Sequence, residues 1–189
     1  MTTSQFEARY RADIDPWHYE TSDYEREKYR ATLEACGPGP FSCALELGAS
    51  IGVFSALLAP RCATLVTIDA APTAVLAARR RLGRANGASV RTLIGELPDA
   101  IGPERFDLVV ASEILYYLTP AALEGTLRRL HETMAPAGRL VAVHWRPAGP
   151  ERPFTAAEVH ARLHAQRWLR HVASGHAAEY LLDVLERSS

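Results

Sequence analysis

The sequence predicts an α/β fold in which helices cover both faces of a mainly parallel β-sheet. Three observations support this prediction. Short apolar runs alternate with longer segments of helical period, helix-start signals stand between the runs, and the last two runs lie too close together for a crossover helix. The chain has 189 residues, 48% of them hydrophobic, so we expect one domain with one buried core.

The first five apolar runs are rich in β-branched residues and have the length of strands that are buried on both faces. They are Cys43–Leu47, Leu65–Ile68, Val90–Ile94, Phe106–Ala111 and Leu140–Val143. Two further strands are predicted at Arg170–Val172 and Tyr180–Leu185, joined through Ser174-Gly175-His176. A connection of this length allows only a hairpin, so an antiparallel strand should finish the sheet.

Capping-box spacings and first-turn prolines mark four helix starts. These are Ser22 with Glu25, Ala71 before Pro72, Thr119 before Pro120, and Thr155 with Glu158. After Pro120 an apolar stripe recurs at helical spacing, formed by Leu123, Leu127, Leu130 and Met134. We expect this helix to pack its stripe on the sheet and to end before Pro136.

Charge and cysteine content restrict the compartment and the partners. The formal net charge is −1, which gives no basic excess for nucleic acid or for an anionic membrane. Three cysteines without paired spacing are typical of reduced thiols. The sequence shows no signal peptide and no apolar run near the roughly 18 residues of a membrane span. We therefore expect a cytoplasmic protein with a small-molecule partner.

The segment Leu45–Gly52 joins a strand to a helix through a turn of small residues. Such a turn lets the backbone approach a ligand closely, and the free N–H groups of the helix favour an anionic group. Asp69 ends the next strand, where a carboxylate can accept hydrogen bonds from both hydroxyls of an adenosine ribose. These features predict a nucleoside cofactor.

The dinucleotide fingerprint does not fit this turn. Placed on Gly48, the pattern G-x-G-x-x-G requires glycines where Ser50 and Val53 stand. Glu46 would also bring negative charge near a pyrophosphate. S-adenosylmethionine (SAM) has no phosphate and carries an ammonium and a sulfonium, so the same acid would attract it. The residues favour SAM, and a nicotinamide-dependent oxidoreductase and a turn without ligand are the alternatives.

Four further motifs extend over most of the chain. They are Asp15-Pro16-Trp17-x-Tyr19 with Ser22-x-Tyr24-Glu25 and Lys28-Tyr29, Phe106-Asp107-Leu108-Val109 with Ser112-Glu113-Ile114-Leu115-Tyr116-Tyr117-Leu118, Ala135-Pro136-Ala137-Gly138, and Val143-His144-Trp145. Together with Leu45–Phe54 they resemble the class I SAM-dependent methyltransferases, and specifically the NodS-like group of nodulation N-methyltransferases. The sequence departs from the group at Ala49, where many relatives have cysteine, and at Ala137, where glycine is usual.

The resemblance implies a Rossmann-like, seven-stranded sheet of order 3-2-1-4-5-7-6, with residues 1–36 as a helical cap and residues 41–189 as the SAM-binding core. SAM would be the methyl donor and S-adenosylhomocysteine (SAH) the product, without a metal. Asp69 would hold the ribose, and Glu96 would face the adenine amino group. The cofactor-binding residues expected on these grounds are Trp17, Glu46, Gly48, Ala49, Ser50, Gly52, Asp69, Ala70, Glu96, Leu97 and Ser112.

The residues that follow the fourth and fifth strands should face the transferred methyl group, because ligands of open parallel sheets bind beyond the carboxyl ends. Glu113 and His144 are therefore candidates for accepting a proton from an amine, with a purely structural role as the alternative for each. Tyr19 is the third catalytic candidate, in an aromatic lid with Trp17. The resemblance implies an amine acceptor such as an amino sugar. An O-methyltransferase and a non-catalytic SAM-binding module are alternatives.

His160 and His164 stand four residues apart in a predicted helix, a spacing that allows two imidazoles to share a metal. No third ligand is evident nearby in the sequence. We therefore expect both histidines on a solvated helix face and predict no metal site.

Overall fold

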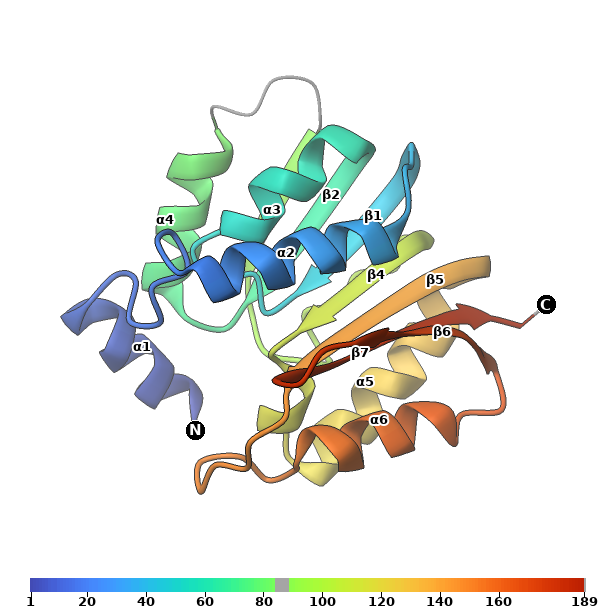
Figure 1. Ribbon diagram of the computed structural model, residues 1–189. Helices are drawn as coiled ribbons and strands as arrows, with labels where there is room; N and C mark the ends of the chain where they lie inside the picture. The colour runs from blue at the N-terminus through green and yellow to red at the C-terminus, as the bar shows by residue number, and fades with distance from the viewer. Residues whose placement is uncertain (84–88, 189) are drawn as a thin grey trace.

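The computed structural model describes residues 1–83 and 89–188 (Figure 1). Its helices are α1 (Thr3–Ala12), α2 (Asp23–Cys36), α3 (Val53–Leu58), α4 (Pro72–Leu82), α5 (Pro120–Thr133) and α6 (Ala156–His164), with short 3-10 helices η1 (Ala59–Arg61) and η2 (Leu115–Tyr117). Its strands are β1 (Phe41–Leu47), β2 (Cys62–Asp69), β3 (Ser89–Ile94), β4 (Phe106–Ser112), β5 (Met134–Trp145), β6 (Leu169–His176) and β7 (Tyr180–Arg187).

The seven strands form one sheet in the order β3-β2-β1-β4-β5-β7-β6. The pairs from β3 through β5 are parallel, and β7 runs antiparallel to both of its neighbours. This is the predicted class I methyltransferase topology, so the predicted fold class is confirmed. The parallel strands need crossover helices, and the hairpin at the end supplies the antiparallel strand.

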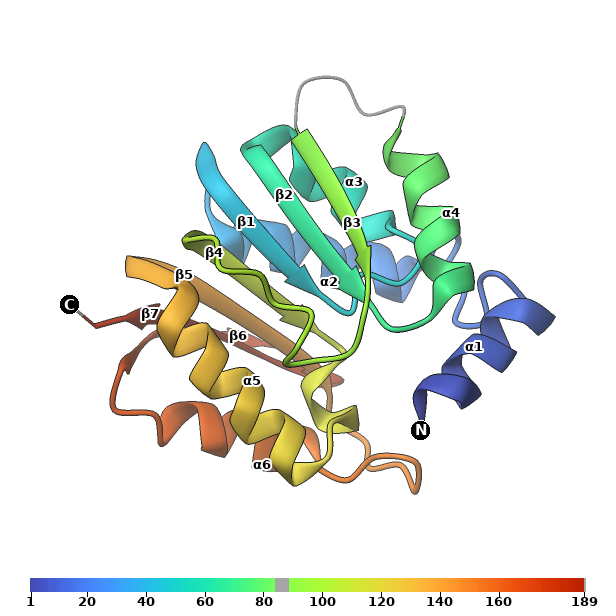
Figure 2. The same ribbon diagram turned by 180° about the vertical axis from the view of Figure 1, so that it is seen from behind.

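Helices cover both faces of the sheet. Figures 1 and 2 show α2 and α3 on one face and α5 and α6 on the other. The predicted α5 stripe is core, because Leu123, Leu127 and Leu130 are buried against strand residues of that face. On the opposite face, Tyr29 of α2 and Phe54 of α3 pack in a second core cluster. The strands are therefore shielded from water on both sides, as their apolar composition requires.

The helix-start signals act as N-caps. Thr155 and Glu158 form a reciprocal capping box, and the Thr119 side chain accepts the N–H of Ala122. At α2, the Ser22 side chain accepts the N–H of Glu25, but the Glu25 carboxylate bonds Lys28 instead of returning to the cap. The spacing of Ser22 and Glu25 therefore marks the start of α2 correctly, although Glu25 does not complete a capping box.

Two predicted boundaries are wrong. Met134, predicted as the last residue of the α5 stripe, is buried as the first residue of β5, because the helix ends at Thr133. The predicted hairpin connection Ser174-Gly175-His176 belongs to β6, and the chain turns at residues 177–179. Both strands of this hairpin extend beyond their apolar cores into polar residues that periodicity does not detect.

The carboxyl ends of β1, β2 and β4 meet at one edge of the sheet, and α1 lies beyond this edge, apart from the sheet (Figures 1 and 2). The amino-terminal segment thus faces the loops where a ligand of such a sheet binds. Among the described helices, none combines the length and the apolar character that crossing a membrane requires.

A pair of leucine substitutions tests the packing of the helix layer. Leu130 of α5 is 0% exposed, whereas Leu76 of α4 is 49% exposed. We expect Leu130→Ala to lower the free energy of unfolding by about 2–5 kcal/mol, since it leaves a cavity. Leu76→Ala should change it by less than about 0.5 kcal/mol. Urea denaturation measures both, and equal effects would contradict the described packing.

Candidate functional site

A cavity of about 1370 Å³ opens at the carboxyl ends of the strands. Its wall is formed by the amino-terminal segment, the turns after β1, β2 and β4, and the loop after β5. The predicted residues that line it are Trp17, Tyr19, Glu46, Gly48, Ala49, Ser50, Asp69, Ala70, Glu96, Leu97, Ser112 and Glu113. Gly52 and His144 do not line it.

The turn after β1 needs glycine at Gly48, which has a φ of +72°. Its N–H donates to the carbonyl of Ile68 at 2.8 Å, so the turn is tied to the end of β2. A Cβ at this position would lie 2.9 Å from the side chain of Ile114. Gly52, also at positive φ, is the N-cap of α3 and packs against Ala78 of α4. Its role is to let α3 approach α4, and no contact with the cavity supports the predicted cofactor role.

Asp69 fixes the geometry of two neighbouring segments. Its Oδ2 accepts the N–H of Ser50 at 2.8 Å, and its Oδ1 accepts the N–H of Ala71 at 2.9 Å. Burial raises the pKa of this carboxyl, while the backbone N–H groups oppose the shift. Each oxygen retains acceptor capacity toward the cavity. Asp69 can therefore hold the turn and a pair of ligand hydroxyls at the same time.

The carboxyl group of Glu46 is buried in the cavity wall. It is 4% exposed, and its Oε2 has no hydrogen-bond partner within residues 1–83 and 89–188. Burial raises its pKa to about 8. A buried carboxyl oxygen without a partner is costly to maintain. A cationic ligand group placed beside it would remove this cost and would restore the charge of the acid.

Side-chain hydrogen bonds of α1 hold the amino-terminal segment against the cavity wall. The hydroxyl of Tyr10 donates to Ser50 Oγ at 2.6 Å, and Thr3 Oγ1 donates to Glu96 Oε1, also at 2.6 Å. Glu7 accepts hydrogen bonds from both the backbone and the side chain of Thr73 at the start of α4. The turn after β1, the loop after β3 and the start of α4 therefore all contact this one helix.

Aromatic rings from distant parts of the chain gather at the same edge. Trp17 stacks on Tyr19 with centroids 5.7 Å apart, and Phe6 meets Tyr117 edge-on at 5.0 Å. Burial raises the pKa of Tyr19 well above its usual value, so the phenol stays protonated at neutral pH. Tyr19 can donate a hydrogen bond or offer its ring to a cation, but it is not a base.

A buried lysine links α2 to the turn after β4. Lys28 is 2% exposed and contacts Glu25 Oε1 at 2.9 Å and Glu113 Oε1 at 3.0 Å. The sequence motifs predicted no role for Lys28. Its burial could have been inferred from helical spacing, because Glu25, Lys28 and Thr32 recur on one face of α2, and that face is buried. Two acids therefore share one ammonium at this end of the cavity, and burial raises the pKa of one of them, Glu25.

Glu113 is held rigidly. Its Oε2 accepts the Tyr116 hydroxyl, and it accepts the N–H of Trp145 at 3.2 Å. Its backbone lies in the left-handed region at a φ of +56°, which is uncommon for a residue other than glycine. Next to it, the Tyr24 hydroxyl and Glu25 Oε2 are buried without a hydrogen-bond partner among the described residues. These groups offer hydrogen-bond capacity to a ligand.

His144 lies behind the cavity wall. It accepts the N–H of Leu115 on Nε2 at 3.2 Å, so its ring proton lies on Nδ1. That proton is donated to His160 Nε2 at 3.0 Å, and His160 Nδ1 then donates to Asp183 Oδ2 at 2.7 Å. Burial and the neighbouring His160 lower the pKa of His144 well below its usual value. With both nitrogens engaged, the ring has no atom free for an acceptor, and this geometry favours the structural alternative.

The solvated helix face predicted for His160 and His164 is wrong for His160, whereas His164 is exposed as predicted. His160 is 4% exposed and belongs to the hydrogen-bonded chain. The side chain of His164 is 40% exposed, and its Nε2 contacts Asp183 Oδ2 at 2.7 Å. The partner comes from β7, so the spacing within the helix gave no sign of it.

The burial of Glu46 predicts a pH dependence of stability. The unfolded chain loses this proton near pH 4.5, but the folded chain keeps it up to about pH 8. The wild type therefore loses stability as pH rises through this window. In Glu46→Gln this loss is absent, so the variant should gain stability relative to wild type between about pH 5 and pH 8. Urea denaturation at both pH values tests this, with exposed Glu124→Gln as the control. A constant difference at Glu46 would contradict the prediction.

Comparisons with known proteins agree with this geometry. The family described as Nodulation protein S (NodS) matches residues 3–179. Nodulation protein S of Rhizobium tropici is 34% identical over 140 residues, which are 73% of this chain and 58% of that protein. Its counterpart from Sinorhizobium fredii is 32% identical over 129 residues, 67% of this chain and 59% of that protein. The chain thus spans about three fifths of the length of these relatives.

A solved structure matches the whole fold. The N-methyltransferase NodS from Bradyrhizobium japonicum WM9, crystallised in complex with S-adenosyl-L-homocysteine, superposes with a TM-score of 0.88. The two proteins are 28% identical, and the match covers 100% of both chains. The resemblance noted in the sequence motifs is thereby confirmed: the chain belongs to the NodS family.

Proposed function

We propose that this protein is a SAM-dependent N-methyltransferase that acts on a small-molecule amine. The observation that carries the proposal is the pair of buried, unpartnered carboxyl oxygens in one cavity, Glu46 Oε2 and Glu25 Oε2. One acid suits the ammonium of a cofactor, and the other suits the N–H groups of an acceptor. The related NodS from Bradyrhizobium japonicum, which was crystallised with SAH, supports the cofactor assignment.

At the cofactor end, we assign Glu46 to the ammonium of the methionine part and Asp69 to the ribose hydroxyls. The Gly48–Ser50 turn provides close backbone approach, and Glu96 would accept the adenine amino group. The ring of Trp17 lines the same cavity. An aromatic face near a sulfonium contributes roughly 0.5–2 kcal/mol of attraction and excludes water.

At the acceptor end, we assign Glu113 to an N–H group of the amine. Because Lys28, Tyr116 and Trp145 hold its carboxylate, Glu113 can orient the acceptor lone pair toward the methyl carbon. Bound SAM would supply an activated methyl group: the lone pair of the neutral amine would form the new nitrogen–carbon bond as the carbon–sulfur bond breaks, SAH would leave, and the extra proton on nitrogen would pass to solvent. Alignment of this kind is worth about 7–11 kcal/mol. Glu25 and Tyr24 would bind further polar hydrogens of the acceptor, for example those of an amino sugar.

We assign residues 1–36 to a cap over this cavity. The polar contacts of α1 to Ser50, Thr73 and Glu96, together with Tyr10 buried against Ile51 and Ala74, hold the helix over the site. The three cysteines are unpaired, which supports the prediction of a cytoplasmic location.

Cofactor binding is the first test. We expect SAH to raise the melting temperature of the wild type and NADH to leave it unchanged. Asp69→Ala should weaken SAH binding at least tenfold, because the ribose hydroxyls lose charged acceptors. Calorimetry measures the affinity. Stabilisation by NADH alone, or an unchanged affinity in Asp69→Ala, would refute the cofactor assignment.

Turnover is the second test. Labelled SAM should transfer its methyl group to members of a panel of amines and amino sugars and leave a matched panel of hydroxylated compounds unlabelled. Glu113→Gln should lower kcat/KM about 10- to 100-fold, while SAH affinity changes by less than about threefold. Exposed Glu124→Gln is the control. Transfer to oxygen acceptors alone, or SAM binding without transfer to either panel, would overturn the proposed reaction.

A further inference from the structure

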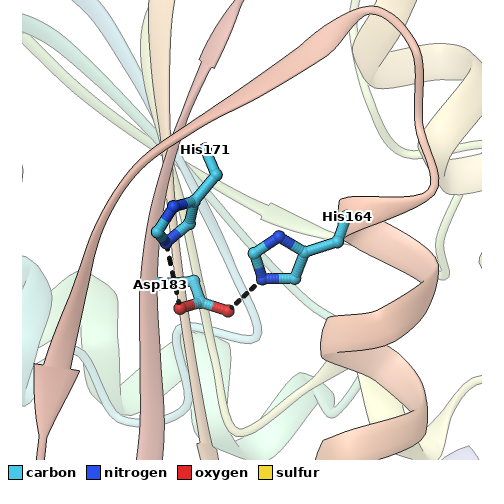
Figure 3. Close-up of side chains that lie close together, drawn as sticks. All are labelled: His164, His171 and Asp183. Atoms are coloured by element: carbon cyan, nitrogen blue, oxygen red, sulfur yellow. Dashed lines mark hydrogen bonds and ion pairs between the residues drawn. The ribbon is translucent and has the colours of Figure 1, made fainter.

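A second group of chemically reactive side chains lies outside the cavity. Figure 3 shows His164 from the end of α6, His171 from β6 and Asp183 from β7 pointing toward one another. His164 Nε2 lies 2.7 Å from Asp183 Oδ2, and His171 Nε2 lies 3.7 Å from Asp183 Oδ1. One nitrogen of each ring and one carboxylate oxygen all lie within 4.8 Å of one another. None of the three residues lines the cavity.

A β-bulge produces this convergence. The pairing of β6 with β7 shifts between His171 and Ala173, so that Val172 is an extra residue in the edge strand. As a result, His171 pairs with Leu185 and Ser174 pairs with Asp183. Residues 183 and 185 point to the same face of β7, so His171 and Ser174 share that face too. Bulges of this kind redirect side chains, and they occur frequently at functional sites.

The carboxylate at the centre is fixed by neighbours behind it. His160 donates to Asp183 Oδ2 at 2.7 Å, and Ser174 Oγ donates to Asp183 Oδ1 at 2.6 Å. Burial raises the pKa of Asp183, but these hydrogen bonds and that of His164 outweigh it and hold the pKa well below the usual value. The acid is therefore ionised at neutral pH. Outer partners that orient a ligating carboxylate are typical of metal sites.

We propose that His164, His171 and Asp183 form a binding site for a divalent transition metal such as Zn²⁺. Two imidazoles and one carboxylate are a ligand set that zinc accepts, and water would complete four-coordination. Each imidazole would ligate through Nε2 and keep its proton on Nδ1. Metal would then replace the hydrogen bond between His164 and Asp183 and the hydrogen bond between His171 Nε2 and Ser174 Oγ, which is 2.9 Å long.

The geometry allows this change. Ligand atoms on one tetrahedral zinc ion lie about 3.3 Å apart, so no separation within the cluster needs to shrink by more than roughly 1.5 Å. The His164 and His171 side chains are 40% and 42% exposed, so their rings can move without disturbing the core. A bound ion would join the end of α6 to the two strands of the terminal hairpin and stabilise this corner of the fold.

The site also connects to the wall of the cavity. The Asp183 carboxylate, through His160 and His144, is bonded to the backbone N–H of Leu115, two residues beyond Glu113. Metal at the surface is therefore linked to the turn after β4 by an unbroken series of hydrogen bonds. The proposed site does not depend on the proposed methyl transfer, because it shares no ligand with the cavity.

Metal binding to untagged, chelator-treated protein tests the proposal. We expect calorimetry with Zn²⁺ to show one site per chain and Zn²⁺ to raise the melting temperature. His164→Gln and His171→Gln should each weaken binding at least tenfold. His131→Gln, an exposed helix histidine outside the cluster, should bind as the wild type does.

Three outcomes would overturn the proposal. The first is wild-type protein that binds no Zn²⁺, and the second is equal binding by wild type and His171→Gln. The third is a thiolate-to-metal absorption band when Co²⁺ replaces Zn²⁺, because it would place the metal on a cysteine. SAH affinity, measured on the same variants, should stay unchanged, so failure of the metal site is distinguishable from failure of the methyltransferase assignment.

Discussion

The unpartnered carboxyl oxygen of Glu46 restricts which ligand the cavity can accept, and the other residues of the site are consistent with this restriction. A buried acid at the end of a central strand is costly, and its Oε2 has no hydrogen-bond partner among the described residues. Asp69, one strand away, adds a second buried acid with its two oxygens partly used by the backbone. A phosphate-bearing ligand would increase the electrostatic cost of both acids. A nucleoside that carries an ammonium and two free hydroxyls reduces it.

The rest of the site surrounds these two buried acids. The sheet topology brings the turns after β1, β2 and β4 to one edge, and α1 and α2 supply the outer wall. Lys28 contacts both Glu25 and Glu113, so the far end of the cavity holds no isolated ammonium among the described residues. The arrangement places the proposed cofactor end and the proposed acceptor end in one cavity.

Local sequence features predicted much of this structure. The parallel strands, the Gly48 turn and the position of Asp69 follow from short-range patterns, because each depends on residues near one another in the chain, whereas the strand order was implied by the motif resemblance. Contacts between distant segments could not be derived in that way. Lys28 meets Glu113 across 85 positions, and Asp183 meets His160 across 23. A buried lysine on a charged helix and a histidine bonded to a later strand both look like surface residues in the sequence. The match to the NodS family confirms the motif resemblance, which carried more information than composition or periodicity.

The pairing of Glu46 with the cofactor ammonium is tested most directly by the number of protons released when SAH binds near pH 7. Titration calorimetry in two buffers of different ionisation enthalpy gives this number for the wild type and for Glu46→Gln. Because Glu46 is largely protonated in the free protein, its pKa being about 8, an arriving ammonium should expel close to one proton from the wild type. The Gln variant should release far less. Equal proton release by the two proteins would contradict the pairing of Glu46 with the cofactor ammonium.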